Sequence, residues 1–358
     1  MRCPLLSMPD RVKIAVIDAS TEDGPPACPY AKQSRYLRSI ANRPLICHVI
    51  DGLARGGIES VLIASGSGVR HQLARVLRDG EPWGVDISCF ETAPDVHGWT
   101  LVSQLREVVS ERPVLVQPAD CLFTGQVSEL RESVGAGGLD LVFLVRQGTG
   151  EGASTLRPVG SLESVRLPRD HPEGTALVIG RSVWPMLDEL AAKPVTMQAM
   201  VRSLDAAGLK VRACEVGEHW CYSSSSEQLL AANRIVLDAM PVDFAAPQLG
   251  DDTDAQGRVI VSPSARVCRS SLRGPLVIGP NAVVSDSFIG PYTAIGSRAT
   301  VVGAELDYTM VLDDAEVRYP GYRLQSSVIG EGALVSKTFE LPTGLRLELH
   351  AGSSVILS

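Results

Sequence analysis

The stretch "RGPLVIGPNAVVSDSFIGPYTAIG", Arg273 to Gly296, carries the most regular pattern in the chain. Apolar residues recur in it every five or six positions, and Ile278, Ile289 and Ile295 are each followed by glycine. A near-hexapeptide repeat is typical of a parallel β-helix, in which each face of the coil contributes one inward aliphatic side chain. The adjacent glycine permits a tight corner. The stretch therefore predicts a solenoid.

The same pattern extends beyond this stretch in both directions. Three apolar series each advance by 17 residues: Val267, Val284, Val301; Leu272, Ile289, Leu306; and Ile278, Ile295, Leu312, Ile329. We expect a β-helix over residues 259–358, preceded by an acidic, turn-rich linker over residues 241–258. A solenoid without a cleft favours a capping or oligomerising role over catalysis.

The first two-thirds of the chain alternates strand-like and helical patterns. The strand-like runs are "KIAVI", "SVLIAS", "VDISCF", "PVLVQ", "LDLVFLV" and "TALVI". The helical stretches are "LICHVIDGLARGG", "VRHQLARVLRDG" and "WTLVSQLREVVSE". Such alternation predicts an α/β domain with a mainly parallel sheet, which we place over residues 10–240. The serines Ser223 to Ser226 precede another helical stretch and indicate a helix N-cap.

Two segments of this domain are candidates for chemistry because they follow predicted strands. One is the loop after Ile17, and the other is "QPADC", Gln117 to Cys121. Ligands of open α/β sheets bind outside the carboxyl ends of the strands. We therefore look for a binding site in these two segments.

Composition excludes several classes of protein. A chain of 358 residues is long enough for two domains. A formal net charge of −8 and a pI near 5.4 argue against a nucleic-acid surface, which needs a basic face. No apolar run approaches the ~18 residues of a membrane span. The eight cysteines include no C-x-x-C pair, so we expect reduced thiols and a cytoplasmic protein.

The order of these parts resembles the sugar-1-phosphate nucleotidyltransferases, and within them the long-form glucose-1-phosphate thymidylyltransferases. The similar segments are "SIANRPLICHVIDGLARGGIESVLIASG", "LRDGEPWGVDISCFETAPDVHGW", "PVLVQPADCLF", "SSEQLLAANRIVLDAM" and the Arg273–Gly296 repeat. The resemblance implies a Rossmann-like nucleotidyltransferase sheet followed by a left-handed β-helix.

The chemistry implied by the resemblance is nucleotidyl transfer. A sugar-phosphate oxygen attacks the α-phosphorus of a nucleoside triphosphate, and pyrophosphate leaves. The family positions the phosphates with a "G-G-x-G-T-R" loop, whose N–H groups and arginine, with a later lysine, neutralise negative charge. Two aspartates of the family hold Mg²⁺. Mg²⁺ is accordingly the cofactor expected if this chain is active.

The phosphate loop of this chain departs from that pattern. The two leading glycines fall on Ala19 and Ser20, and no arginine lies between Val12 and Ser34. Asp18, Glu22 and Asp23 add negative charge where a triphosphate would lie. The lysine position falls near Ser34 or Arg35, with Lys32 as a shifted substitute, so Lys32 and Arg35 are the predicted catalytic cations.

The metal and base positions are partly retained. Asp120 matches the first metal aspartate and is the predicted metal ligand, whereas the second falls on Tyr222. Glu91 matches the contact to the base, and Gly98 matches the glycine bend. The predicted nucleotide- and sugar-binding positions are therefore Ala19, Ser20, Glu91, Gly98 and Asp120.

Three function classes follow from a retained fold with an altered site. The first is a non-catalytic pseudoenzyme that binds a nucleotide or nucleotide sugar, or regulates a relative. The second is a divergent, active sugar-1-phosphate nucleotidyltransferase, and the third is a structural oligomerisation protein. We expect no nucleic-acid or membrane partner, and either a homo-oligomer or a hetero-oligomer with an active relative.

Overall fold

The computed structural model describes residues 11–20, 34–93, 96, 98–123, 127–134, 138–146, 157–158, 176–191, 203–216, 219–221, 225–240, 249–337 and 355. The chain divides into two compact units. The first comprises residues 1–22 and 46–221, and the second comprises residues 23–45 and 222–358. The predicted boundaries near residues 240 and 258 stay a prediction. The chain crosses between the units more than once.

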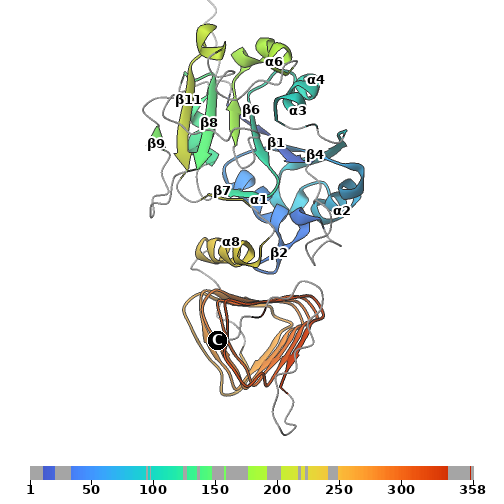
Figure 1. Cartoon of the computed structure of the whole chain (residues 1–358), viewed down its shortest axis with the longest axis vertical. Coiled ribbons are helices and arrows are strands. Elements are labelled where there is room, and N and C mark those ends of the chain that lie inside the picture. Colours follow the sequence, from blue (N-terminus) through green and yellow to red (C-terminus); the bar gives the residue numbers. More distant parts are fainter. Residues whose placement is uncertain are drawn as a thin grey trace, which may run out of the picture. The chain divides into compact units, whose positions relative to one another are not determined.

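An eight-stranded mixed sheet organises the first unit (Figure 1). In spatial order its strands are β5 (Asp86–Glu91), β4 (Ser60–Ser65), β1 (Ile14–Ala19), β6 (Val114–Pro118), β10 (Leu177–Ile179), β8 (Leu141–Arg146), β11 (Val211–Val216) and β9 (Arg157–Pro158). The first four pair in parallel, as do β8 and β11. The predicted α/β class with a mainly parallel sheet is confirmed.

Strand direction differs from the expectation at one central position. The run predicted from "TALVI" forms β10, which is antiparallel to both β6 and β8. Its described residues Leu177, Val178 and Ile179 are all buried. A continuous apolar run indicates a strand buried on both faces, but it carries no information about strand direction.

Helices pack around this sheet. They are α1 (Leu45–Arg55), α2 (Ser67–Leu77), α3 (Gly98–Gln104), α4 (Arg106–Val109), α5 (Val127–Ser133) and α6 (Trp184–Ala191), with short 3-10 turns at Glu81–Trp83 and Arg181–Val183. One core cluster joins Val16 and Val116 of the sheet to Leu101 of α3 and Trp184 of α6. The Trp184 indole donates to the carbonyl oxygen of Arg112 at 3.1 Å. The helical periodicity correctly predicted α1 and α2, while the third predicted helix is interrupted at Leu105.

A two-stranded antiparallel sheet lies beyond β6. It pairs β7 (Cys121–Phe123) with β12 (His219–Cys221). Cys121 is disulfide-bonded, whereas Cys89, Cys214 and Cys268 are free thiols. The expectation of reduced thiols is therefore wrong for Cys121, because a disulfide needs spatial proximity and not a C-x-x-C spacing.

The second unit contains a β-helix of three five-stranded parallel sheets, drawn in Figure 1 as the sides of a triangle. The first sheet is β13 (Asp254–Gln256), β16 (Ser271–Arg273), β19 (Phe288–Ile289), β22 (Glu305–Asp307) and β25 (Leu324–Gln325). The second is β14 (Val259–Val261), β17 (Leu276–Ile278), β20 (Thr293–Ile295), β23 (Met310–Val311) and β26 (Val328–Ile329). The third is β15 (Arg266–Cys268), β18 (Val283–Ser285), β21 (Thr300–Val302), β24 (Glu316–Arg318) and β27 (Leu334–Ser336). The predicted left-handed β-helix class is confirmed, and β13 lies within the segment predicted as linker.

The inward residues follow the predicted series with one correction. Val267, Val284 and Val301 stack in register, as do Leu272, Ile289 and Leu306. In the third series Ile295 pairs with Val311, so the predicted core residue Leu312 is wrong. That coil is one residue short at the corner holding Asp307 and Tyr308. The next coil is longer, because Val311 pairs with Ile329.

The corner glycines act through close approach between coils. A Cβ on Gly296 would lie 2.6 Å from the Asp313 Oδ1 atom and 2.7 Å from its backbone N. A Cβ on Gly279 would lie 2.9 Å from the carbonyl carbon of Gly296. The left-handed corner conformations instead fall on Asn281 and Arg298, with φ values of 57° and 60°. Glycine is thus needed at these corners for space and not for backbone handedness.

Two further segments belong to the second unit. A hairpin pairs β2 (Ser39–Ile40) with β3 (Arg43–Pro44), and it follows a 3-10 turn at Arg35–Leu37. Helix α8 (Ser226–Asp238) has Ser225 as its N-cap, whose side chain accepts a hydrogen bond from the Gln228 N–H at 3.2 Å. The predicted capping role of the serine run is confirmed at Ser225. Within the described residues, no helix is both long and apolar enough to cross a membrane.

Candidate functional site

Four parallel strands bring several predicted site residues to one edge of the sheet. Ala19 at the end of β1 pairs with Ser65, and Ser65 pairs with Glu91 at the end of β5. On the other side Asp18 pairs with Pro118, two residues before Asp120. The carboxyl ends of these strands therefore meet at a single edge, where ligands of open α/β sheets bind.

The turn after β1 closes on the carboxylate of Asp18. Ser20 donates its backbone N–H to the Asp18 Oδ1 atom at 3.0 Å, and its hydroxyl contacts the same oxygen. The Ser20 hydroxyl also lies 3.1 Å from the carbonyl oxygen of Val96. Both Ala19 and Ser20 are buried. The first backbone donor after the strand, which a phosphate loop would aim at its ligand, is therefore held within the turn.

The other strand ends are more open. The Glu91 side chain is 54% exposed and lies 3.8 Å from Arg70 of α2, an exposed pair of small energetic value. Gly98 is the first residue of α3. Asp120 lies half-buried in the turn between β6 and β7. The sheet edge thus presents two carboxylates, Glu91 and Asp120, on either side of the Asp18 turn.

Of the two predicted cations, the structure describes Arg35. Arg35 opens the 3-10 turn of the second compact unit, in the same segment as the hairpin. Lys32 and Tyr222 lie outside the described residues. Their roles stay predictions.

Two hydroxyl residues at the edge were missed by sequence reasoning. Ser65 ends β4 and Thr92 follows β5, and the Thr92 N–H donates to the Ser65 carbonyl oxygen at 3.1 Å. Both side-chain oxygens are buried and have no hydrogen-bond partner among the described residues. Buried polar atoms are nearly always satisfied, so an unsatisfied pair marks a place where a ligand or water is expected. The available sequence signal was a hydroxyl residue directly at each strand end.

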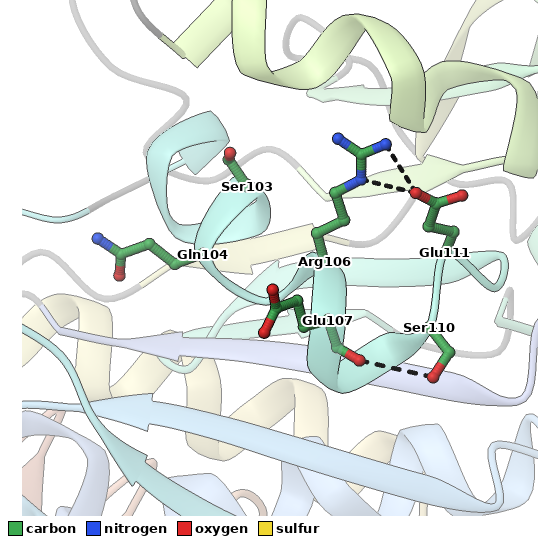
Figure 2. Close-up of a pocket in the computed structure, with 6 residues that line it drawn as sticks. All are labelled: Ser103, Gln104, Arg106, Glu107, Ser110 and Glu111. Atoms are coloured by element: carbon green, nitrogen blue, oxygen red, sulfur yellow. Dashed lines mark hydrogen bonds and ion pairs between the residues drawn. The ribbon is translucent and has the colours of Figure 1, made fainter.

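A separate surface hollow of about 540 Å³ lies at the opposite end of β6. Figure 2 shows its lining residues on α3, α4 and the following turn: Ser103, Gln104, Arg106, Glu107, Ser110 and Glu111. The Arg106 Nε atom lies 2.7 Å from the Glu111 Oε1 atom, so its positive charge is matched locally. This balance makes the hollow a poor phosphate site.

Comparison with known proteins finds distant relatives that cover most of the chain. No family model matches the chain. A glucose-1-phosphate thymidylyltransferase of Streptomyces antibioticus is 24% identical over 335 residues, covering 90% of this chain and 93% of that protein. The low-salt glycan biosynthesis nucleotidyltransferase Agl11 of Haloferax volcanii is 23% identical over 337 residues, covering 90% and 94%.

A solved structure agrees on the fold. It is a Bacillus anthracis protein in complex with sucrose, assigned as a glucose-1-phosphate thymidylyltransferase, with a TM-score of 0.51 and 13% identity. The match covers 65% of this chain and 98% of that one. The chain is a distant relative of the sugar-1-phosphate nucleotidyltransferases. The resemblance inferred from the order of its segments is confirmed.

Sugar-1-phosphate nucleotidyltransferases generally use Mg²⁺, which prefers several carboxylate, phosphate and water oxygens. In the described part of this chain, no three His, Cys, Asp or Glu side chains gather closely enough to hold a metal ion. The Asp18 carboxylate already accepts hydrogen bonds from Ser20. The described residues therefore contain no metal site built from three protein ligands, and Asp120 stays the predicted ligand.

Proposed function

We propose that this sugar-1-phosphate nucleotidyltransferase relative binds a nucleotide or nucleotide sugar without transferring a nucleotidyl group, and acts as a regulatory member of sugar-nucleotide metabolism. The supporting observation is the hydrogen bond from the Ser20 N–H to the Asp18 carboxylate. In the family this turn supplies N–H groups to phosphate. Here the corresponding N–H group is held by a negatively charged side chain.

Electrostatics favours a weaker phosphate interaction at this turn. A carboxylate beside the phosphate position repels the ligand, and repulsion between unit charges ~4 Å apart is about 4 kcal/mol at an effective dielectric of 20. Transfer also requires stabilisation of further negative charge in the transition state, where losing one preorganised donor typically costs about 10²–10³ in rate. Binding of a sugar or base tolerates these losses better than catalysis does.

The proposed binding surface is the carboxyl edge of β5, β4, β1 and β6. The exposed Glu91 carboxylate provides a polar group for a base or sugar. In this proposal Gly98 allows the ligand to approach the backbone closely, and Asp120 contacts the sugar or a metal ion. The backbone of Ala19 and Ser20 faces the phosphate groups. Lys32 and Arg35 are the proposed phosphate cations.

A second candidate is a divergent active transferase. It is favoured by Asp120, whose carboxylate is retained after β6 and which would hold Mg²⁺ there with the ligand phosphates completing the coordination. In that case the ion would supply Lewis-acid neutralisation of the phosphates.

One panel separates the two candidates. Melting temperatures of the full chain are measured with nucleoside triphosphates and nucleotide sugars, with and without Mg²⁺, alongside pyrophosphate release from each triphosphate with glucose 1-phosphate. A ligand that binds the native state raises its melting temperature. Shifts without turnover support the binding protein. Robust turnover that disappears in Asp120→Asn would instead establish the active transferase, and absence of any shift would leave the structural role.

Self-association through the β-helix is part of the proposal. Tyr319 and Tyr322 are 54% and 56% exposed and lie in the loop that lengthens one coil, between β24 and β25. The Lys337 ammonium lies 5.4 Å from the Tyr322 ring centroid. Exposed tyrosines beside cations are typical of interface hot spots.

A further inference from the structure

The hairpin of the second unit turns through two left-handed residues. Ser39 pairs with Pro44 and Ile40 with Arg43, which leaves Ala41 and Asn42 as the turn. Their φ values are 46° and 64°. A two-residue turn with both φ values positive is a type I′ turn, which favours glycine and asparagine. Alanine is disfavoured in this conformation because its Cβ crowds the following carbonyl oxygen. The turn therefore needs support from outside the hairpin.

Asn233 of α8 provides that support. Its side chain is fully buried, and its Oδ1 atom accepts a hydrogen bond from the Ala41 N–H at 3.0 Å. Its Nδ2 atom donates to the Tyr292 carbonyl oxygen of the β-helix at 2.9 Å. A backbone N–H only donates and a carbonyl only accepts, so the two partners fix the orientation of the amide. Asn233 thus bridges the strained turn to a coil of the β-helix.

A second amide fastens the same turn. Asn42 donates from Nδ2 to the Ile295 carbonyl oxygen at 2.6 Å. Ala41 is therefore connected to the β-helix through Asn233, and Asn42 is hydrogen-bonded to the β-helix directly.

The Ala41–Asn42 turn is linked by hydrogen bonds to the segment that precedes it, residues 34–38. The Leu45 N–H donates to the Arg38 carbonyl oxygen at 2.9 Å, which closes the base of the hairpin. Before it, Ser34 caps the 3-10 turn of Arg35–Leu37, and Tyr36 of that turn is buried. A conformational change at the tip of the hairpin is thus transmitted to Arg35 through a short series of hydrogen bonds.

We propose that Asn233 is a positioning residue for segment 34–45, holding the strained Ala41 turn on the β-helix so that Arg35 is presented in one conformation. The inference rests on the proposed function for the role of Arg35 in binding phosphate. It makes the β-helix a support for the binding segment, in addition to any part in self-association.

The test compares three variants of the full chain: Asn233→Ala, Asn233→Ala with Ala41→Gly, and Arg234→Ala. The last is the matched control, since Arg234 is the exposed neighbour of Asn233 on α8. Backbone amide exchange is measured by NMR at Ala41, Arg38 and Leu45, and the affinity for the ligand that gives the largest thermal shift is measured by titration.

We expect Asn233→Ala to speed exchange by about tenfold or more at all three amides, as loss of a buried hydrogen bond predicts. Ligand affinity should weaken several-fold. Adding Ala41→Gly should restore protection at Arg38 and Leu45 and recover affinity, because glycine adopts the positive φ without support. Arg234→Ala should leave all of these unchanged.

Two results overturn the proposal: unchanged exchange at Arg38 and Leu45 in Asn233→Ala, or no recovery on adding Ala41→Gly. Failure of the proposed function can be told apart from failure of this proposal. In the first case the wild-type chain binds no ligand, and the amide exchange of the variants still tests the positioning role of Asn233. If Asn233→Ala does not fold, Asn233→Asp replaces it. The carboxylate still accepts from Ala41 but cannot donate to Tyr292, so we expect Arg38 and Leu45 to lose protection, and retained protection overturns the proposal.

Discussion

Ser20 donates its backbone N–H to the Asp18 carboxylate at 3.0 Å, across the turn that follows β1. The Asp18 carbonyl oxygen accepts in turn from the Ala119 N–H at 2.8 Å. A backbone hydrogen bond thus joins the turn after β1 to the turn after β6, while the Asp18 carboxylate closes the first turn on itself.

The first prediction concerns that carboxylate. Asp18→Ala should tighten binding of a nucleoside diphosphate sugar by about tenfold, because it removes like charge and releases the Ser20 N–H toward the ligand. Isothermal titration of the full chain measures the change. The matched control is Asp86→Ala, an exposed aspartate at the amino end of β5. Equal affinity in all three proteins would place the phosphate elsewhere.

The second prediction concerns restoration of catalysis. A Ser20→Gly, Asp23→Thr, Gly24→Arg variant should remain nearly inactive in pyrophosphate release, because Tyr222 is predicted to stand at the position of the second metal aspartate. Adding Tyr222→Asp should then raise the rate, since metal and loop elements act as a unit. Full activity of the loop variant alone would mean that Tyr222 does not occupy the metal position.

The third prediction concerns self-association. Tyr322→Ser should lower the apparent molar mass of the chain at micromolar concentration, as measured by light scattering after size-exclusion chromatography. Val108→Ser is the control, because Val108 is 57% exposed on α4 and lies outside the β-helix. A wild-type chain that is already monomeric, or equal loss in both variants, would contradict an interface at the tyrosine loop.

The fourth prediction concerns acid stability of the β-helix. The Arg269 guanidinium holds the pKa of Asp286 below its ordinary value of 3.8, and Arg298 does the same for Asp314. A carboxyl whose pKa is lowered by folding adds stability above pH 3.8, and that stability is lost as the pH falls through the folded pKa. The melting temperature of an Asp286→Asn, Asp314→Asn variant should therefore lie below wild type at pH 7 and approach it below pH 3.8. Both pairs are exposed, so the gap should be small and should shrink in high salt. A gap that widens on acidification would show that other groups dominate.

The fifth prediction contrasts two glycines. Gly296→Ala should destabilise the protein by about 1–3 kcal/mol, because the added Cβ meets the Asp313 backbone. Gly68→Ala should be neutral or stabilise by up to about 1 kcal/mol, since Gly68 lies in α2 with nothing within 4 Å of the added carbon. Thermal melts of the two variants measure the contrast. Equal effects would mean that the coil spacing at Gly296 relaxes freely.

The local sequence determined most of the secondary-structure elements. The β-helix was predictable because each of its short strands places one aliphatic residue inward. The period of the coil therefore appears in the sequence as a period of aliphatic residues. Strands β1, β4 and β6 were predictable because apolar runs indicate buried strands, and the end of each run indicates the start of a loop. Strand ends predicted the loop after Ile17 and the segment Gln117 to Cys121, whereas Ala19, Ser20 and Glu91 were assigned from the resemblance to the family.

Tertiary structure decided what those residues contact. The bond from Ala41 to Asn233 joins residues 192 positions apart, and no local pattern encodes a partner at that distance. The same holds for the antiparallel direction of β10, the bonding of Cys121, and the burial of the Ser65 and Thr92 hydroxyls. The one-residue shift from Leu312 to Val311 arose because register is set by pairing with the previous coil, and a single shortened corner changes which neighbour points inward. Sequence periodicity reports the preference of each segment, whereas partners, register and strain are settled only when distant segments pack together.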